Sequence, residues 1–255
     1  MGESAATDRG TLIVTGGSRG IGAATARAAA RDGYAVCINY RERRYDAAAL
    51  ADSIVRGGGR AISVQADTSR EEDVVRLYAT SDRELGPLRA LVNNAGITGR
   101  VGVVADIAAD MLREVLAVNI VGCFLCAREA IRRMSIARGG QGGAIVNVSS
   151  RAAVLGAQGE LVHYAASKGA IDTMTIGLAQ EVAAQGIRVN AVRPGLIDTE
   201  IHASGGAGDR LQRLLASVPM GRVGTPDEVA ATILWLLSSR APYVNGAIVD
   251  ISGAR

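Results

Sequence analysis

The sequence has few aromatic residues and almost no lysine. Eight of its 255 residues are aromatic, and Lys168 is the single lysine among 28 basic residues. The basic residues are scattered along the chain and nearly balanced by 25 acidic ones, which gives a net charge of +3. A nucleic-acid-binding surface typically needs a clustered basic patch with interleaved aromatic side chains. We therefore expect no nucleic-acid partner, although a single phosphate-binding pocket remains compatible with this composition.

Cysteine and histidine are also scarce. The three cysteines, Cys37, Cys123 and Cys126, are an odd number in a chain without a secretory leader, which favours reduced, buried thiols over a disulfide framework. With two histidines and no clustered ligands, we predict no metal site. No apolar run approaches the roughly 18 residues that a membrane span requires. We expect a soluble, cytoplasmic protein without a membrane partner.

Short apolar runs alternate with helical segments along the whole chain. Strands are expected at 11–14, 35–39, 61–65, 88–92, 144–149, 187–192 and 247–251, and helices at about 21–32, 45–56, 71–85, 108–138, 162–184 and 227–238. Nearly continuous apolar strands between helices are typical of a parallel sheet that is covered on both faces. With five prolines and no composition shift, the sequence predicts a single α/β domain over residues 1–255. Its fold would be a Rossmann-type, doubly wound parallel sheet of about seven strands.

The connection from 196 to 224 is long for such a fold. It contains Gly205, Gly206 and Gly208, and a short helix is expected around 209–216. Because long connections in compact domains are often lids or binding loops, we interpret this segment as a substrate lid.

Two turns at strand ends indicate a nucleotide site. The first predicted strand is followed by Thr15-Gly16-Gly17-Ser18-Arg19-Gly20-Ile21-Gly22, whose glycines allow a sharp turn and a close approach of backbone N–H groups to a pyrophosphate. The fourth strand ends in Asn93-Asn94-Ala95-Gly96, at the sheet edge where open α/β folds bind ligands. Each of these two sequences is also common in ordinary tight turns that bind no ligand.

A tyrosine and a lysine stand four residues apart in Tyr164-Ala165-Ala166-Ser167-Lys168, at the start of a predicted helix. Residues at i and i+4 share a helix face, so the ammonium can favour the ionised form of the phenol. That Lys168 is the only lysine strengthens this interpretation, because a guanidinium cannot replace a compact ammonium. Ser149 and Ser150 end the preceding strand and bring a hydroxyl within plausible reach.

In order along the chain, these motifs closely resemble the classical short-chain dehydrogenase/reductase family. The resemblance covers essentially the whole chain: the Gly-rich turn, Asp67, Asn93 to Gly96, Asn119, Ser150, Tyr164 with Lys168, and Pro194-Gly195. Within the family, the chain looks most similar to reductases of the 3-oxoacyl-carrier-protein and glucose dehydrogenase type. A small carbonyl or alcohol substrate and a homotetramer are implied, with a dimer left open.

The resemblance also implies roles for the catalytic residues. Tyr164 would be the general acid or base at the substrate oxygen, and Ser150, with Ser149 as a competitor, would polarise that oxygen. Lys168 would favour the ionised tyrosine and bind the nicotinamide ribose, and Asn119 would hold a water in the proton relay. The spacing from Ser150 to Tyr164 is one residue longer than is usual in the family.

Cofactor contacts follow from the same resemblance. They are expected at Gly16, Ser18, Arg19, Gly20, Ile21, Gly22, Asn39, Tyr40, Arg41, Asp67, Thr68, Asn93, Ala95, Gly96, Tyr164, Lys168, Pro194, Gly195, Ile197 and Thr199. The second strand ends in Asn39-Tyr40-Arg41 without the acidic residue that would bind the ribose of NAD, and Arg19 and Arg41 could bind a 2′-phosphate. Arg43 or Arg44 could assist, whereas Glu42 weakens the argument. NADP(H) is therefore favoured over NAD(H).

The substrate itself is not indicated by any motif. We expect its pocket to involve Val154, Leu155, Gln158, Leu161 and His163, together with the 196–224 segment, although His163 could instead cap the helix. A catalytically silent nucleotide-binding sensor on the same fold is the alternative, because a fold does not determine a function. The complete set of Asn119, Ser150, Tyr164 and Lys168 favours an enzyme.

Overall fold

The computed structural model describes residues 9–200 and 210–255 of the chain. Seven strands form one sheet in the order β3-β2-β1-β4-β5-β6-β7, and every neighbouring pair is parallel. The strands are β1 (Thr11–Val14), β2 (Ala35–Tyr40), β3 (Arg60–Gln65), β4 (Leu88–Asn93), β5 (Gly143–Val148), β6 (Ile187–Pro194) and β7 (Ile248–Ile251). This arrangement confirms the predicted doubly wound sheet.

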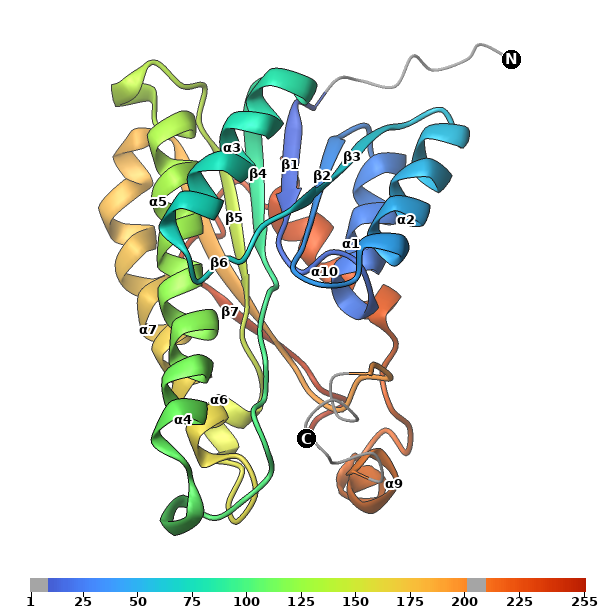
Figure 1. Ribbon diagram of the computed structural model, residues 1–255, viewed down its shortest axis with the longest axis vertical. Coiled ribbons are helices and arrows are strands. Elements are labelled where there is room, and N and C mark those ends of the chain that lie inside the picture. The colour runs from blue at the N-terminus through green and yellow to red at the C-terminus, as the bar shows by residue number, and fades with distance from the viewer. Residues whose placement is uncertain (1–8, 201–209) are drawn as a thin grey trace.

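Helices cover both faces of the sheet (Figure 1). One face carries α1 (Gly20–Arg31), α2 (Arg44–Arg56) and α10 (Pro226–Leu237), and the other carries α3 (Glu71–Leu85), α5 (Gly122–Met134) and α7 (Val162–Val182). The remaining helical segments are α4 (Ala109–Leu116), α6 (Ala152–Leu155), α9 (Arg210–Leu214), η1 (Val104–Asp106), η2 (Ala117–Val121), η3 (Ile136–Arg138), η4 (Ala183–Gln185) and η5 (Leu215–Ser217).

The strands are apolar on both faces because each face packs against helices. In β1, Leu12 and Val14 join the core under α1, α2 and α10, whereas Ile13 joins the core under α3, α5 and α7. All three side chains are fully buried. The alternation of side chains along a strand thus supplies two separate cores from one continuous apolar run.

The chain reverses its direction of winding between β1 and β4. Strands β2 and β3 lie on one side of β1, and β4 to β7 follow on the other side. In open α/β sheets, ligands bind at the carboxyl edge beside such a switch point. The turns after β1 and β4, which carry the two predicted nucleotide motifs, therefore lie next to each other.

The region expected to be one helix from 108 to 138 is divided. It consists of α4, the π-helical segment η2, α5 and the short 3-10 segment η3. Asn119 lies within η2. Segments of π-helix are rare and frequently occur at functional sites, and this one carries a residue that the sequence assigns to the catalytic set.

The predicted lid is only partly described. Leu196 and Ile197 are buried, and Ile197 forms a β-bridge with Gly224. The segments α9 and η5 occupy the position of the short helix expected at 209–216. His202 and the glycines at 205, 206 and 208 lie outside the described residues. Across 9–200 and 210–255, no helix combines the length and the apolar character needed to cross a membrane.

Candidate functional site

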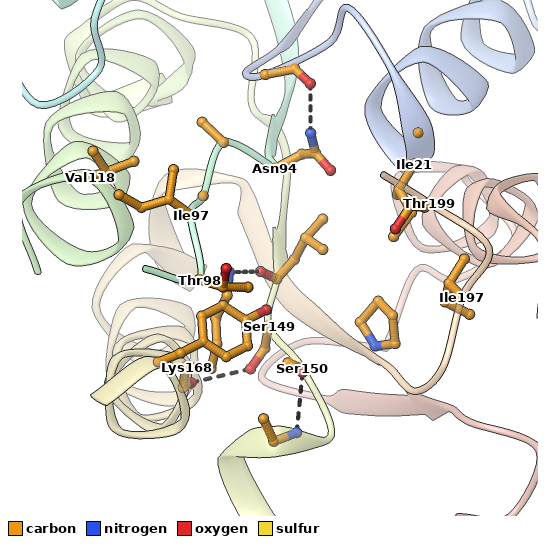
Figure 2. Close-up of a pocket in the computed structure, with 18 of the residues that line it drawn as sticks. Ile21, Asn94, Ile97, Thr98, Val118, Ser149, Ser150, Lys168, Ile197 and Thr199 are labelled. Carbon is orange, nitrogen blue, oxygen red and sulfur yellow. Dashed lines mark hydrogen bonds between the residues drawn. The ribbon is translucent and has the colours of Figure 1, made fainter. Parts of the chain in front are cut away.

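A cavity of about 490 Å³ opens at the carboxyl edge of the sheet. Its lining comes from the segments that follow β1, β2, β3, β4, β5 and β6, together with the start of α7 and the C-terminal residue Arg255. Figure 2 shows Ile97 and Val118 on one side, Ile21, Ile197 and Thr199 on the opposite side, and Ser149, Ser150 and Lys168 between them. The cavity has the size and concavity that small-molecule and cofactor sites require.

Most residues predicted to contact the cofactor line this cavity. These are Gly16, Ser18, Arg19, Gly20, Ile21, Asn39, Tyr40, Arg41, Asp67, Thr68, Ala95, Gly96, Tyr164, Lys168, Pro194, Gly195, Ile197 and Thr199. Gly22 and Asn93 are not among the lining residues. Gly22 is buried behind the turn, and Asn93 donates its side-chain amide to Asn147 in the protein interior at 3.0 Å.

The turn after β1 is held by the end of β4. Asn94 donates its side-chain amide to the carbonyl oxygens of Thr15 and Gly16, both at 2.9 Å. The hydroxyl oxygen of Thr15 in turn accepts hydrogen bonds from the backbone N–H groups of Asn94 and Ala95, both at 3.0 Å. These four contacts fix the two motif-bearing turns to each other across the switch point.

Gly16 allows this close approach. Its φ is +59°, a left-handed conformation that favours glycine, and a Cβ atom there would lie 2.9 Å from Ala95 Cα. The following helix, α1, begins at Gly20, and no side chain of its N-cap residue Arg19 caps it. Its first N–H groups therefore lie at the cavity in the arrangement that binds a phosphate at a helix N-terminus.

Lys168 and Tyr164 meet at the cavity as their i, i+4 spacing predicts. The Lys168 Nζ atom lies 5.7 Å from the centre of the Tyr164 ring and donates a hydrogen bond of 2.7 Å to the carbonyl oxygen of Val148. The ammonium is buried, whereas the tyrosine is half-buried. The end of β5 thus holds the lysine at the phenol, and both groups face the same cavity.

The two serines after β5 are placed differently. Ser149 is buried and donates its hydroxyl to the carbonyl oxygen of Lys168 at 3.1 Å. The hydroxyl oxygen of Ser150 accepts a hydrogen bond of 3.1 Å from the backbone N–H of Ala152. The Ser150 hydroxyl therefore accepts one hydrogen bond and can still donate its proton to a ligand. The Ser149 hydroxyl already donates its proton to the backbone of α7.

Asn119 is buried beside this group rather than in the lining of the large cavity. Its Oδ1 atom accepts from the Ile97 N–H, and its Nδ2 atom donates to the Ile97 carbonyl oxygen and to Ser167 Oγ, each at 2.9 Å. Ser167 donates to the carbonyl oxygen of Tyr164 at 2.7 Å. The side chain in the π-helical segment thus joins the loop after β4 to the tyrosine-bearing turn of α7.

The predicted substrate residues separate into two groups. Leu155 and Gln158 line the cavity, but Val154, Leu161 and His163 do not. Val154 is half exposed to solvent, and Leu161 is buried in the protein. His163 is buried as well, and its Nε2 atom contacts the carbonyl oxygen of Thr98 at 2.9 Å. Its position supports the loop that walls the cavity.

Several lining residues were missed by sequence reasoning: Ile97, Thr98, Val118, Arg151 and Arg255. Ile97, Thr98 and Arg151 directly follow motif residues at strand ends, so their positions carried a usable signal. Leu214 belongs to the predicted 196–224 lid, whereas Arg255 reaches the cavity only through the tertiary fold, and no local pattern marks it.

The cysteines lie in the core. All three are free and buried, as predicted. Burial raises the pKa of Cys37 and of Cys123 to about 12, and it raises that of Cys126 further. The described part of the chain contains no group of three or more His, Cys, Asp and Glu side chains arranged to hold a metal ion.

Known proteins resemble this chain over nearly its full length. The family model described as enoyl-(acyl carrier protein) reductase matches residues 16–253. An uncharacterized oxidoreductase of Escherichia coli K12, YgfF, is 52% identical over 243 residues, which cover 95% of this chain and 98% of that protein. Glucose 1-dehydrogenase 2 of Bacillus subtilis is 37% identical over 95% of this chain and 93% of its own length.

Two solved structures with bound dinucleotides are also similar. A blue fluorescent protein from a metagenomic library, in complex with NADPH, has a TM-score of 0.90 and 32% identity, with 98% of this chain and 99% of that chain covered. A short chain dehydrogenase from Burkholderia cenocepacia J2315, in complex with NADP, has a TM-score of 0.88, 34% identity and the same coverage.

Proposed function

This chain belongs to the short-chain dehydrogenase/reductase family and is an oxidoreductase acting on CH–OH and C=O groups, and we propose that it uses NADP(H) to interconvert a ketone and a secondary alcohol. The observation that carries the proposal is the meeting of Ser150, Tyr164 and Lys168 in one cavity with the Gly-rich turn. In this arrangement nucleotide binding and proton transfer would share one cavity.

The fit of a dinucleotide rests on the backbone. Gly16 lets the turn after β1 pack closely against Ala95, and the N-terminus of α1 offers N–H groups to a pyrophosphate. Pro194, Gly195, Ile197 and Thr199, at and after the end of β6, would hold the nicotinamide end. When bound, the cofactor supplies or accepts the hydride, and the protein orients and polarises the reacting groups.

In the reducing direction, Tyr164 donates its phenolic proton to the substrate oxygen as the alcohol forms. Ser150 donates a hydrogen bond to the same oxygen and polarises the carbonyl before the transfer. Lys168 places its ammonium 5.7 Å from the centre of the Tyr164 ring and would bind the ribose hydroxyls of the cofactor. Asn119 keeps the turn that carries Tyr164 against the loop after β4. In the oxidising direction the proton moves back to Tyr164.

The preference for NADP(H) is supported by charge at the adenosine end of the cavity. Arg19, Arg41 and Arg43 line this end, and guanidinium groups bind phosphate oxygens in charge-assisted pairs. The side chain of Asn39, where NAD-binding members would carry an acid, accepts from the Gly16 N–H at 3.2 Å and donates to the Ala66 carbonyl oxygen at 2.9 Å. It is thus engaged in holding the backbone of the turn.

Tyr164→Phe tests the acid/base assignment. The substitution keeps the ring but removes the proton donor, so turnover of a ketone panel with NADPH should fall by at least about 100-fold while the Kd for NADPH changes little. Tyr243→Phe, at a fully exposed tyrosine, is the matched control and should retain wild-type turnover. Retained turnover in Tyr164→Phe would refute the assignment. Ser150→Ala should impair turnover more than Ser149→Ala.

A homotetramer is proposed as the working assembly. Val121, Phe124 and Ile176 lie half exposed on η2, α5 and α7, which leaves large apolar side chains on the outer side of this helical layer. Packing against a second copy of the same helices would bury them, in keeping with the closed symmetry of most oligomers. Sedimentation equilibrium of the purified protein distinguishes a tetramer from a dimer, and a monomer would refute the proposal.

A further inference from the structure

A carboxylate joins two arginines at the adenosine end of the cavity. The Oε2 atom of Glu200 lies 2.8 Å from Arg19 Nη1 and 2.9 Å from Arg43 Nη2. Arg19 is the N-cap residue of α1, Arg43 is the N-cap residue of α2, and Glu200 follows β6. All three residues line the cavity, so segments distant in the sequence converge on one anion-binding point.

The arrangement resembles the way in which two guanidinium groups hold one phosphate oxygen. Arginine binds carboxylate and phosphate oxygens with the same donor geometry, so either anion can occupy this position. The third arginine at this end, Arg41, is also paired: it donates to Glu42 at 2.6 Å and lies 3.6 Å from Glu114. The cationic end of the cavity therefore carries its own counter-ions.

We propose that Glu200 determines cofactor specificity, because its carboxylate occupies the anion site that the 2′-phosphate of NADP takes. The phosphate must displace this carboxylate from Arg19 and Arg43, whereas NAD, which has no 2′-phosphate, leaves the contact in place. Glu200 thus lowers the affinity for NADP(H) but not that for NAD(H). It therefore reduces the preference for NADP(H) over NAD(H) that the arginines alone would give. This inference rests on the proposed use of NADP(H).

The experiment compares Glu200→Gln with wild type in NADPH and NADH titrations at one fixed salt concentration. The contact is solvent-exposed, with side-chain exposures of 33% for Arg19, 45% for Arg43 and 59% for Glu200. Exposed ion pairs are weak, so the Kd for NADPH should fall by about three- to tenfold and that for NADH should change by less than about twofold. An equal change for both cofactors, or weaker NADPH binding, would overturn the proposal.

Glu72→Gln is the matched control for net charge. Glu72 is exposed and pairs with Arg70 at 2.6 Å, and it does not line the cavity. Glu72→Gln removes the same charge as Glu200→Gln but does so outside the cavity. The affinity of this variant for NADPH should therefore equal that of the wild type. Should it tighten NADPH binding equally, the effect of Glu200→Gln would be a general charge effect, and the proposal would fail.

A double-mutant cycle locates the effect. In an Arg19→Met/Arg43→Met background, Glu200→Gln should no longer alter the Kd for NADPH, because the two guanidinium groups from which the phosphate would displace the carboxylate are gone. A gain that persists in this background would place the action of Glu200 elsewhere.

A smaller probe separates this inference from the proposed function. If wild type binds neither NADPH nor NADH, the proposed function fails, and adenosine 2′,5′-bisphosphate titrated against 5′-AMP still reports on the anion site. Selective tightening of the bisphosphate in Glu200→Gln would support the Glu200 contact even then. The same affinity ratio in both proteins would refute it.

Discussion

Gly22 lies where helix α1 passes behind the Gly-rich turn, and Gly22→Ala tests whether that packing holds the nucleotide site. A Cβ atom at Gly22 would lie 2.6 Å from Asn94 Nδ2, 2.6 Å from the Gly16 carbonyl oxygen and 3.0 Å from Gly17 Cα. Ordinary van der Waals contact begins at 3.4 Å. Two of these neighbours are backbone, and the third is held by hydrogen bonds to Thr15 and Gly16. None can move without disturbing the turn.

The expected magnitude follows from these contacts. Overpacking costs about 1–3 kcal/mol, and loss of one hydrogen bond of Asn94 adds about 0.5–1.5 kcal/mol. Alanine recovers about 1 kcal/mol through its better helix propensity. The free energy of unfolding should therefore fall by about 0.5–3.5 kcal/mol. Because the displaced turn is also the proposed pyrophosphate site, the Kd for NADPH should rise by at least about tenfold.

Urea unfolding and NADPH titration of the same samples measure both effects. Gly177→Ala is the matched control, since Gly177 lies within α7 and an added Cβ would meet nothing within 4 Å. It should raise the free energy of unfolding by about 0.5–1 kcal/mol through helix propensity alone and leave NADPH binding unchanged. The reasoning is refuted if Gly22→Ala shows the small gain of Gly177→Ala and binds NADPH as tightly as wild type.

Two further predictions concern buried polar groups. Arg193 donates a hydrogen bond of 2.9 Å to the buried carboxylate of Asp172. Arg193→Met should therefore lower the free energy of unfolding, measured by urea titration, by about 3 kcal/mol, and Asp172→Asn in the same background should recover part of this loss. A loss below about 1 kcal/mol would contradict this reasoning. Burial raises the pKa of all three cysteines, so none should react with a thiol reagent at pH 8 in the folded protein. All three should react after the protein is unfolded in urea. Rapid modification of a thiol in the folded protein would contradict this prediction.

The sheet could be predicted because most of its inner strands are buried on both faces. A run such as Leu12-Ile13-Val14 has no polar side chain for a solvent-exposed face of the sheet, and glycines follow such runs in the turns at the strand ends. The π-helical segment around Asn119 could not be predicted in this way. The contacts of Asn119 with Ile97 and Ser167 come from distant parts of the chain, so no local pattern signals them.

The substrate wall shows a second limit of sequence reasoning. Sequence reasoning places five pocket residues between Ser150 and Tyr164, namely Val154, Leu155, Gln158, Leu161 and His163. The short helix α6 and the left-handed residues Gly156 and Ala157 give the chain a conformation in which Val154 is half exposed while Leu155 and Gln158 reach the cavity. Alternation between inside and outside within such a turn depends on individual φ and ψ angles, and composition does not encode them.

Cofactor preference is the property for which counting charged residues is least adequate. The arginines after β1 and β2 favour a phosphate, and this much follows from the sequence. Their partners Glu114 and Glu200 come from α4 and from the segment after β6, and only the fold brings these carboxylates to the cofactor end. A bound phosphate gains the difference between its own contacts with the guanidinium groups and the carboxylate contacts that it replaces. The same three arginines would therefore discriminate more strongly for NADP(H) in a chain without an acid at the position of Glu200.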